Sequence, residues 1–307
     1  MKGIDFIGDI HGEYDHLTNL LTKLGYISNS RSWRHPQGRK VCFLGDYVDR
    51  GPKILEVLQT VRGMVDSGDA FAIMGNHEFN FIAWHTPLTD GSTERCRPEH
   101  KRYQMEESLL QLGDSAGEWA DWMRTLPASW EIKGASAVHA CWFLEDVELL
   151  MEEWVAAGNY WTEELIRRSS LGAPLFDVVE RVMKGPELTL PSGVTIELGK
   201  GDVRTDARIQ WWCPPDTTMD LGLQIIPRKD TPGVKLTLDQ SRAWPKTLSS
   251  DDSIVFCGHY WLRAETPEPR SEKVVCLDYS VAKKGFLCAY RYDGETVATA
   301  DKMVASV

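Results

Sequence analysis

The chain has 307 residues, which allows one large domain or two domains of ordinary size. Hydrophobic residues make up 42% and charged residues 26%, the composition of a globular protein with a sizeable core. The net charge of −11 argues against binding of long nucleic acids, whose affinity comes mostly from Lys and Arg. It does not exclude a small anionic substrate, because bound divalent cations can reverse the local potential.

Neither a membrane segment nor a disulfide framework is expected. No stretch approaches the roughly 20 apolar residues that cross a bilayer, and the absence of a secretory signal predicts a cytoplasmic protein. The seven cysteines are scattered singly, without a CxxC pair, so we expect buried free thiols and no structural zinc site. The pattern indicates no particular oligomeric state.

Short apolar runs that end in glycine and polar residues recur along the chain and predict buried strands. They are Ile4–Ile7, Val41–Leu44, Phe71–Met74, Ala135–Val138 and Ile254–Cys257. Helices are expected between the first three runs, over Tyr14–Leu24, which places four leucines on one face, and over Pro52–Ser67. The alternation of strands and helices in the N-terminal half predicts an α/β layered core.

The middle of the chain has a less regular pattern. Residues 86–134 look mostly helical or irregular, with helices expected over Glu106–Leu112 and Glu118–Leu126. Residues 145–183 also have a helical pattern. The run Leu188–Leu198 contains a Pro-Ser-Gly turn and predicts a β-hairpin.

The strand pattern of the core returns near the C-terminal end. Strands are expected over Ser253–Cys257, Lys273–Asp278 and Phe286–Tyr292. We therefore interpret the whole chain, residues 1–307, as a single domain in which residues 145–250 form an insertion or lid.

Polar side chains follow the predicted strands at the point where each one ends. They are Asp9, His11, Asp46, Asn76, His139 and His259. Because sites in open α/β sheets form at the carboxyl ends of strands, these side chains are expected to meet at one edge. Carboxylate, imidazole and amide oxygen suit divalent manganese, iron or zinc. Six ligands around one bridging carboxylate suit a pair of ions, which can activate a water and clamp a phosphoryl group.

Three motifs carry a resemblance to a known family. GDIHG at 8–12, GDYVDRG at 45–51 and GNHE at 75–78 completely fill the pattern GDxHG, GDxVDRG, GNHE. In this the sequence resembles the calcineurin-like metallophosphoesterases, and within them the phosphoprotein phosphatase type. The resemblance covers residues 3–80 and resumes around His139, around His259 and at 277–295, where it looks like the bacterial members. It implies a layered β-sandwich core flanked by helices, with a mixed α+β insertion.

The resemblance also implies how the ligands are shared. Asp9 and His11 would bind the first metal ion, and Asp46 would bridge to the second. The second ion would be bound by Asn76, His139 and His259. Two divalent ions are thus implied, with manganese as the first choice and iron or zinc as alternatives. Asn76 would also contact the substrate.

Three further residues have implied roles outside the metal ligands. His77 would donate a proton to the leaving group, Asp49 would orient it, and Arg50 would bind phosphate oxygens with its planar guanidinium. A local salt bridge at a helix start is the structural alternative for Asp49 and Arg50. A second phosphate-binding arginine is expected in protein phosphatases, and no motif chooses among the candidates Arg168, Arg204 and Arg208.

The site predicts metal-dependent hydrolysis of phosphate esters, and three functions fit it. The first choice is a serine/threonine protein phosphatase, because GDYVDRG and GNHE occur together. The alternative is a nucleotide phosphohydrolase, either a diadenosine tetraphosphate hydrolase or a polynucleotide phosphatase, which the bacterial-looking tail favours. The tryptophans could form a wall for a nucleobase or peptide, or pack the core. A non-catalytic binding module that kept the fold is the third, and the complete site argues against it.

Overall fold

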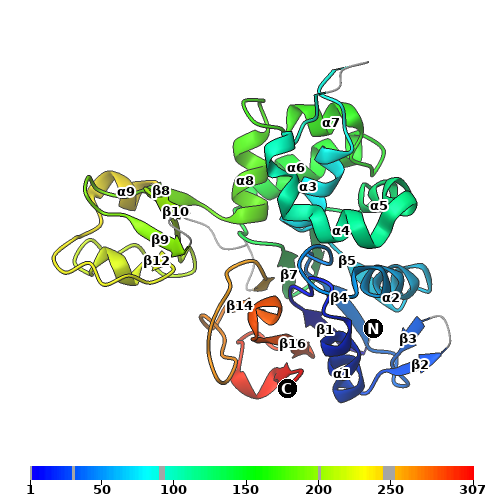
Figure 1. Cartoon of the computed structure of the whole chain (residues 1–307). Helices are drawn as coiled ribbons and strands as arrows, with labels where there is room; N and C mark the ends of the chain where they lie inside the picture. Colours follow the sequence, from blue (N-terminus) through cyan, green and yellow to red (C-terminus); the bar gives the residue numbers. More distant parts are fainter. Residues whose placement is uncertain (1, 30–31, 90–93, 200–201, 245–252) are drawn as a thin grey trace.

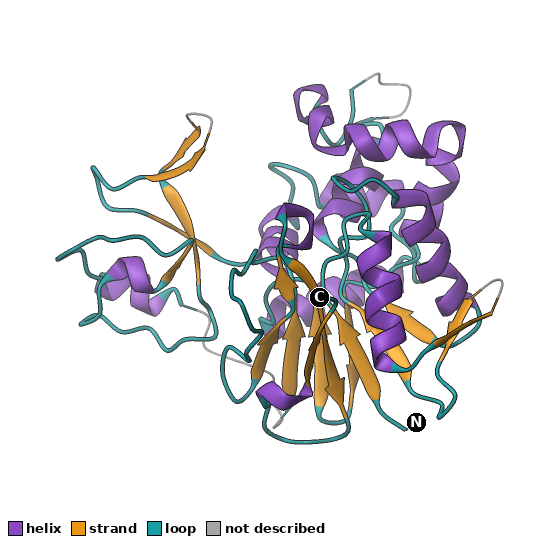
Figure 2. Ribbon diagram, turned by 60° about the horizontal axis from the view of Figure 1, so that its bottom comes forward, coloured by secondary structure: helices purple, strands orange, loops and turns teal. Residues whose placement is uncertain are grey.

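Two β-sheets that face each other form the centre of the molecule (Figures 1 and 2). The computed structural model describes residues 2–29, 32–89, 94–199, 202–244 and 253–307. The strands of the first sheet are β1 (Ile4–Ile7), β4 (Lys40–Phe43), β5 (Ala70–Ala72), β15 (Asp278–Tyr279), β16 (Phe286–Tyr292) and β17 (Met303–Ala305). Those of the second sheet are β6 (Ser129–Ile132), β7 (Ala135–Val138), β13 (Ile254–Cys257) and β14 (Val274–Cys276).

Alternate side chains of each strand point to opposite faces and so build two cores. In β1, Ile4 and Phe6 lie in the layer between the sheets, whereas Ile7 lies in the core beneath the helices. Phe6 stacks on Phe256 of β13 with ring centroids 3.8 Å apart. The buried, apolar strands therefore form a β-sandwich with helices on its outer faces. This confirms the fold class that the sequence predicts.

Strands β1, β4 and β5 are parallel and are connected through helices α1 (Tyr14–Leu24) and α2 (Ile54–Asp66). Helix α1 buries Leu17, Leu20, Leu21 and Leu24, as its apolar spacing predicts. It ends where Gly25 adopts φ 90°, and the Gly25 N–H donates to the carbonyl groups of Leu21 and Thr22. The parallel arrangement brings the carboxyl ends of the three strands to one edge of the sheet.

A layer of short helices lies above that edge (Figure 1). Its helices are α3 (Asn76–Trp84), α4 (Glu106–Leu112), α5 (Ala116–Met123), α6 (Leu144–Ala156), α7 (Glu163–Arg168) and α8 (Phe176–Lys184). The 3₁₀ segments Glu99–Met105 and Gly113–Ser115 flank α4. Helix α3 begins inside the GNHE motif, where no helix was predicted. Gly75 precedes it with extended backbone, and Glu78 at its third position completes a capping arrangement.

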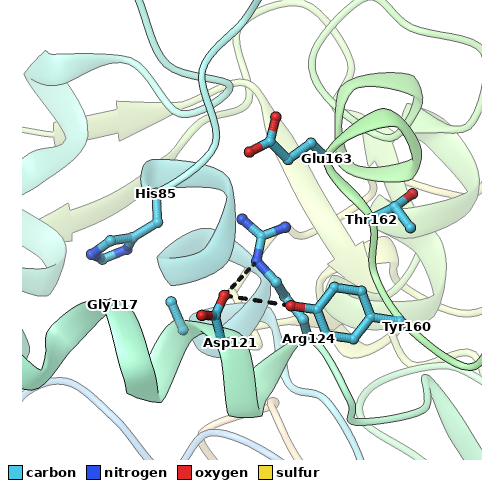
Figure 3. Close-up of a pocket in the computed structure, with 8 residues that line it drawn as sticks. His85, Gly117, Asp121, Arg124, Tyr160, Thr162 and Glu163 are labelled. Carbon is cyan, nitrogen blue, oxygen red and sulfur yellow. Dashed lines mark hydrogen bonds and ion pairs between the residues drawn. The ribbon is translucent and has the colours of Figure 1, made fainter.

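Arg124 ties the helical layer together (Figure 3). Its guanidinium donates to the Trp161 carbonyl oxygen at 2.9 Å and to Thr86 Oγ1 at 2.7 Å, and its Nε lies 3.8 Å from Asp121 Oδ1. The Trp161 indole donates to the Leu126 carbonyl at 2.9 Å. A cavity of about 450 Å³ opens beside these residues. Because the polar groups of Arg124 are already bonded within the chain, we interpret its role as structural.

Residues 187–199 and 202–244, called here the extension, project away from the sandwich (Figures 1 and 2). The extension contains β8 (Glu187–Thr189), β9 (Ile196–Gly199), β10 (Asp202–Arg204), β11 (Asp206–Ile209), the 3₁₀ turn Leu221–Leu223, β12 (Ile225–Ile226) and α9 (Leu238–Arg242). The hairpin predicted over Leu188–Leu198 is wrong, because β8 pairs with β11 and β9 pairs with β10. The turn itself forms, with the Val194 N–H donating to the Pro191 carbonyl at 2.9 Å. Local turn chemistry thus did not determine which strands pair.

The remaining elements lie at the periphery. They are the β2 (Ile27–Asn29) and β3 (Ser32–Arg34) hairpin and the 3₁₀ turns Val281–Lys283 and Ala300–Lys302. All seven cysteines are free thiols, as predicted. Among the described residues, none of the helices has the length and apolar character needed to span a membrane. Residues 200–201 and 245–250 of the predicted insertion lie outside the described residues, and the insertion stays a prediction.

Candidate metal centre

The predicted site residues meet at the carboxyl ends of strands from both sheets. Asp9 and His11 follow β1, Asp46 follows β4, and His139 and His259 follow β7 and β13. Asn76 and His77 begin helix α3. Three of these residues have left-handed backbone: His11 at φ 47°, Asp46 at φ 56° and His259 at φ 72°. Such conformations are costly for residues with a Cβ and are found mostly at functional sites.

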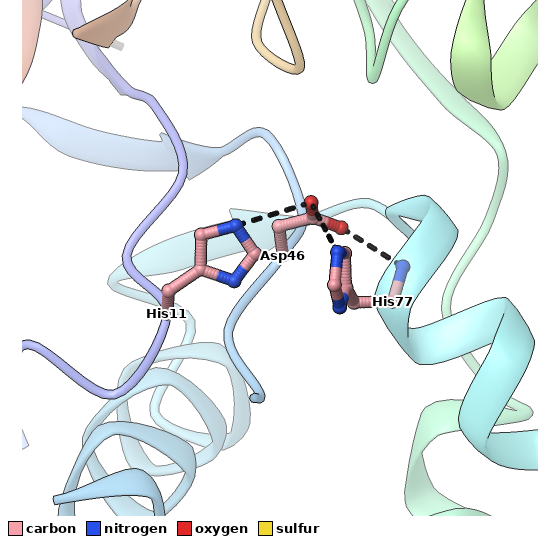
Figure 4. A group of neighbouring side chains, drawn as sticks. All are labelled: His11, Asp46 and His77. Carbon is pink, nitrogen blue, oxygen red and sulfur yellow. Dashed lines mark hydrogen bonds and ion pairs between the residues drawn. The ribbon is translucent and has the colours of Figure 1, made fainter. Parts of the chain in front are cut away.

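Asp46 lies between imidazole groups on two sides (Figure 4). Its Oδ2 lies 3.5 Å from His11 Nε2 and 3.8 Å from His77 Nε2. Its Oδ1 lies 3.3 Å from His139 Nε2 and accepts the His77 backbone N–H at 3.0 Å. Each carboxylate oxygen therefore faces a different group of nitrogen atoms. This is the arrangement in which one carboxylate can bridge two cations.

Asn76 joins the second group of imidazoles. Its Oδ1 lies 3.1 Å from His139 Nε2 and 2.8 Å from His259 Nδ1. The His259 backbone N–H donates to both oxygens of Asp9, at 3.2 and 3.1 Å. Asp46, His139 and His259 form one buried group with the spacing of metal ligands, and His11, Asp46 and His77 form another. The group around His11 and Asp46 thus contains His77 in the structure, whereas the sequence analysis placed Asp9 beside His11.

The buried charges of the site are crowded. Burial raises the pKa of Asp9 well above its ordinary value, and the neighbouring carboxylates of Asp278 and Asp46 raise it further. Burial alone would raise the pKa of Asp46 as well, but His139, His77 and His11 together lower it. The pKa of His11 is lowered, first by burial and then by repulsion from His77. Divalent cations would relieve both the crowded carboxylates and the loss of hydration.

The tautomers of the histidines fit metal binding. His11 Nδ1 donates to the Val48 carbonyl at 2.8 Å, and His139 Nδ1 donates to the Leu44 carbonyl at 2.7 Å. Such bonds leave the lone pair on Nε2, which is how ligating histidines are held. The Nε2 atoms of His11 and His259 are buried and have no hydrogen-bond partner in the described chain. An unsatisfied buried nitrogen calls for a partner, and a metal ion would supply one.

The Glu78 carboxylate holds the loop that carries Asp46. Its Oε2 accepts the backbone N–H groups of Asp46 at 2.7 Å and of Gly75 at 3.0 Å. Its Oε1 accepts those of Tyr47 at 2.8 Å and Val48 at 3.2 Å. One fully buried side chain thus satisfies four buried donors. It also fixes the end of β4 against the start of α3.

Glycines let the carboxylates approach the backbone. A Cβ on Gly75 would lie 2.3 Å from Asp46 Oδ1, and a Cβ on Gly258 would lie 2.0 Å from Asp9 Oδ1. Both separations are far shorter than any van der Waals contact. These two positions therefore require glycine for as long as the two carboxylates keep their places.

His77 belongs to a chain of bonded side chains. Its Nδ1 lies 2.5 Å from Asp49 Oδ2, and its Nε2 lies 3.1 Å from Arg50 Nη2. Because Arg50 can only donate, the proton of His77 in this state sits on Nδ1. The Ser108 hydroxyl of α4 donates to Asp49 Oδ1, and the Asp49 N–H donates back to Ser108 Oγ at 2.8 Å. Asp49 therefore bonds His77 and Ser108, and a salt bridge to Arg50 is not observed.

The structure separates the three candidates for a second arginine. Arg168 is bound through two 2.7 Å hydrogen bonds to Glu153, and Arg204 lies 3.6 Å from Glu187. Arg208 of β11 lies close enough to His259 that its charge, after burial, is the largest influence that lowers the histidine pKa. Arg208 is paired as well, since its Nε donates to the Lys184 carbonyl at 2.8 Å and lies 3.5 Å from Glu187 Oε1. All three arginines are thus bonded within the chain, and Arg208 is the one whose charge acts on His259.

The tryptophans mostly pack the core. Trp142, Trp161, Trp211 and Trp212 are buried, with at most 6% of their surface exposed. The Trp211 indole donates to the Ala140 carbonyl at 3.1 Å. The candidates for an aromatic wall were Trp142, Trp154, Trp161, Trp211, Trp212 and Trp261. Of these six, Trp261 makes a ring contact with a predicted metal ligand, with its ring centroid 6.5 Å from that of His11. The tryptophans therefore do not all join in one aromatic wall.

Sequence reasoning missed several residues of the site. Glu78 stands within the GNHE motif, and its place three residues after Gly75 was a signal for a helix cap. Ser108 lies in a predicted helix without a motif, and Asp278 and Lys283 lie in the stretch 277–295, whose resemblance assigned them no role. They reach the site only through the tertiary fold.

The comparisons with known proteins agree with this geometry. The family model described as calcineurin-like phosphoesterase matches residues 3–162, just over half of the 307 residues. The protein therefore belongs to the calcineurin-like phosphoesterase family, as the sequence predicts. This family membership supports a centre for divalent metal ions.

Curated relatives are similar over part of their length. One bis(5′-nucleosyl)-tetraphosphatase PrpE [asymmetrical], from Geobacillus sp. (strain WCH70), is 46% identical over 127 residues, 38% of this chain and 51% of the relative. Another protein with that name, from Halalkalibacterium halodurans, is 49% identical over 73 residues, 24% of this chain and 30% of the relative. The chain thus spans about half or less of the length of these relatives.

Solved structures share the fold. A cold-active protein tyrosine phosphatase has a TM-score of 0.50 at 19% identity, with 99% of this chain and 78% of that chain covered. A protein serine/threonine phosphatase from Saccharomyces cerevisiae has a TM-score of 0.50 at 13% identity, with 98% and 78% covered. The TM-scores indicate a common fold. At identities of 19% and 13%, the likeness carries no information on substrate.

Replacing Glu78 by Gln should destabilise the protein while keeping the side-chain shape. The amide NH₂ would face two backbone N–H groups, and each buried donor without an acceptor costs about 1–3 kcal/mol. We expect the melting temperature to fall by about 5–10 °C, measured by circular dichroism at fixed metal concentration. Glu148→Gln, at an exposed position of α6, is the control. Equal melting temperatures of the two variants would contradict the structural role of Glu78.

Proposed function

We propose that this phosphoesterase is a nucleotide phosphohydrolase that splits bis(5′-nucleosyl) tetraphosphates. The observation that supports the proposal is the 46% identity over 127 residues to a protein of that name. It favours the alternative that the sequence analysis left open over a serine/threonine protein phosphatase. The net charge of −11 agrees with a small nucleotide better than with a long nucleic acid.

We propose further that the buried group of the site holds two divalent ions. Asp9, His11 and Asp46 would hold the first ion, and Asp46 would also hold the second. The other ligands of the second ion are Asn76, His139 and His259. When bound, the ions supply charge neutralisation for the phosphoryl oxygens and lower the pKa of a water molecule. Manganese is our first choice, with iron or zinc as alternatives, because the ligands mix carboxylate, imidazole and amide oxygen.

The residues beside the ligands bind and protonate the substrate in this proposal. Arg50 holds the oxygens of the reacting phosphate, together with Asn76. Arg208 supplies a second guanidinium from the side of His259, which its effect on the pKa of His259 supports. When Arg50 contacts the phosphate in place of His77, Nε2 is free to take up a proton from solvent, which it then donates to the leaving oxygen. Asp49, held by Ser108, keeps the Nδ1 proton of His77 in place and fixes the orientation of the ring.

Asp46→Asn tests the bridging role. The amide keeps an oxygen for the His77 backbone N–H but loses the negative charge that two cations would share. We expect the purified variant to retain at most one of two ions, measured by elemental mass spectrometry after gel filtration. Asp114→Asn, at an exposed position, should retain the wild-type metal content. Retention of two ions by Asp46→Asn would contradict the bridging role of Asp46.

His77→Ala tests proton donation. General acid catalysis contributes about 10²–10⁴-fold, and its loss matters most for a leaving group that is a poor acid. We expect hydrolysis of an alkyl phosphate to slow by at least tenfold more than hydrolysis of p-nitrophenyl phosphate. Ser108→Ala should shift the same ratio in the same direction by a smaller factor, and the exposed His100→Ala should not shift it. Equal slowing of both substrates would exclude His77 as the acid.

A substrate panel tests the proposed activity itself. Diadenosine tetraphosphate, phosphoserine peptides and 3′- or 5′-phosphorylated oligonucleotides are compared through kcat/KM with manganese present. We expect about a hundredfold preference for diadenosine tetraphosphate, which corresponds to ~2.7 kcal/mol of transition-state binding. Chromatography should find a nucleoside triphosphate and a monophosphate as products. A comparable preference for the peptides would instead establish the protein phosphatase that the sequence first suggested.

A further inference from the structure

Two cations converge on one tryptophan at the edge of the metal centre. The Arg50 guanidinium carbon lies 3.9 Å from the centroid of the Trp261 ring, and Lys283 Nζ lies 3.4 Å from it. A small pocket is lined by these residues together with His11 and Asp278. The aromatic ring attracts both charges through its electron-rich faces. The tryptophan thus holds a lysine beside the arginine that we assign to the phosphate.

The two cations are not neutralised by an ion pair. Within the described chain, neither Arg50 nor Lys283 has a carboxylate oxygen within 4.0 Å. Burial, followed by repulsion from Arg50 and Arg263, lowers the pKa of Lys283. The carboxylates of Asp46, Asp278, Asp49 and Asp9 act on Arg50 from beyond that distance, and Asp278 acts on Lys283. With cations bound to the acidic centre, the two side chains would present positive charge to an anion.

Hydrogen bonds to the backbone fix the loops that carry Trp261 and Lys283. The Trp261 N–H donates to Asp278 Oδ2 at 2.7 Å, and Asp278 Oδ1 accepts the Ser280 N–H at 2.9 Å. Lys283 ends a 3₁₀ turn whose carbonyl acceptor is Ser280, at 2.8 Å from the Lys283 N–H. The buried Asp278 therefore connects the two loops that carry the tryptophan and the lysine. A binding group prepared in this way loses less entropy when its ligand arrives.

We propose that Lys283, held against Trp261, binds a phosphate of a polyphosphate chain beyond the phosphate that Arg50 holds. The lysine thereby makes the site prefer polyphosphates to simple phosphate monoesters. This specificity role rests on the proposed function, because Lys283 would bind the part of the tetraphosphate chain that Arg50 does not hold. A compact ammonium group suits a phosphate that must be held but not oriented by two-point contact. Stacking of a nucleobase on Trp261 is disfavoured, since its ring already contacts two cations.

The test compares Lys283→Gln with the wild type on two substrates. We expect kcat/KM for diadenosine tetraphosphate to fall about tenfold, the effect of losing one charged hydrogen bond. The value for p-nitrophenyl phosphate, which has no second phosphate, should stay within about twofold of wild type. Lys284→Gln, the exposed neighbour in the same turn, is the control and should change neither. Equal losses on both substrates, or no loss on the tetraphosphate, would overturn the proposal.

A second measurement separates this inference from the proposed function. Inorganic tripolyphosphate and orthophosphate are compared as inhibitors of p-nitrophenyl phosphate hydrolysis at a fixed free metal concentration. We expect Lys283→Gln to raise the inhibition constant of tripolyphosphate about tenfold and to leave that of orthophosphate unchanged. An unchanged tripolyphosphate constant would refute the role of Lys283 even if diadenosine tetraphosphate is a substrate. If it is not a substrate, the proposed function falls and the inhibitor comparison still decides the role of Lys283.

Discussion

The carboxylate of Glu78 is the contact on which the arrangement of the site depends. It accepts four backbone N–H groups, from Gly75 and from residues 46–48. These donors belong to two loops that follow neighbouring parallel strands, so that one carboxylate joins both loops. Asp46, Asn76 and His77 therefore take their positions from one shared acceptor. The left-handed backbone at Asp46 persists because the surrounding hydrogen bonds specify it.

The electrostatics of the molecule follow from that geometry. Carboxylates at Asp9, Asp46 and Asp278 are buried close enough to one another to raise the pKa of Asp9, which is an unfavourable arrangement without cations. The imidazoles present nitrogen atoms without partners in the same place. Cationic side chains lie outside this acidic centre, Arg50 and Lys283 on one side and Arg208 on another. Negative charge inside and positive charge outside suit metal ions and a phosphate respectively.

Much of the fold was predictable, because its signals are local. The bounds of β1, β7, α1 and α4 agree with the sequence pattern, since apolar spacing and flanking glycines specify them. The motifs likewise identified the side chains that gather at the strand ends. The roles of these side chains stay predictions. The pairing of β8 with β11 was missed, because strand partners depend on packing between segments that are distant in sequence.

Gly75 of the GNHE motif and Gly258 after β13 limit which substitutions the site can accept. At Gly75 and Gly258 a single methyl group would overlap a carboxylate oxygen. No side chain is intermediate in size between hydrogen and methyl, so even a substitution by alanine would clash at these positions. A lineage can lose either glycine only together with the carboxylate that rests against it. Each glycine and its carboxylate therefore constrain each other sterically, even where they lie as far apart in the chain as Asp9 and Gly258.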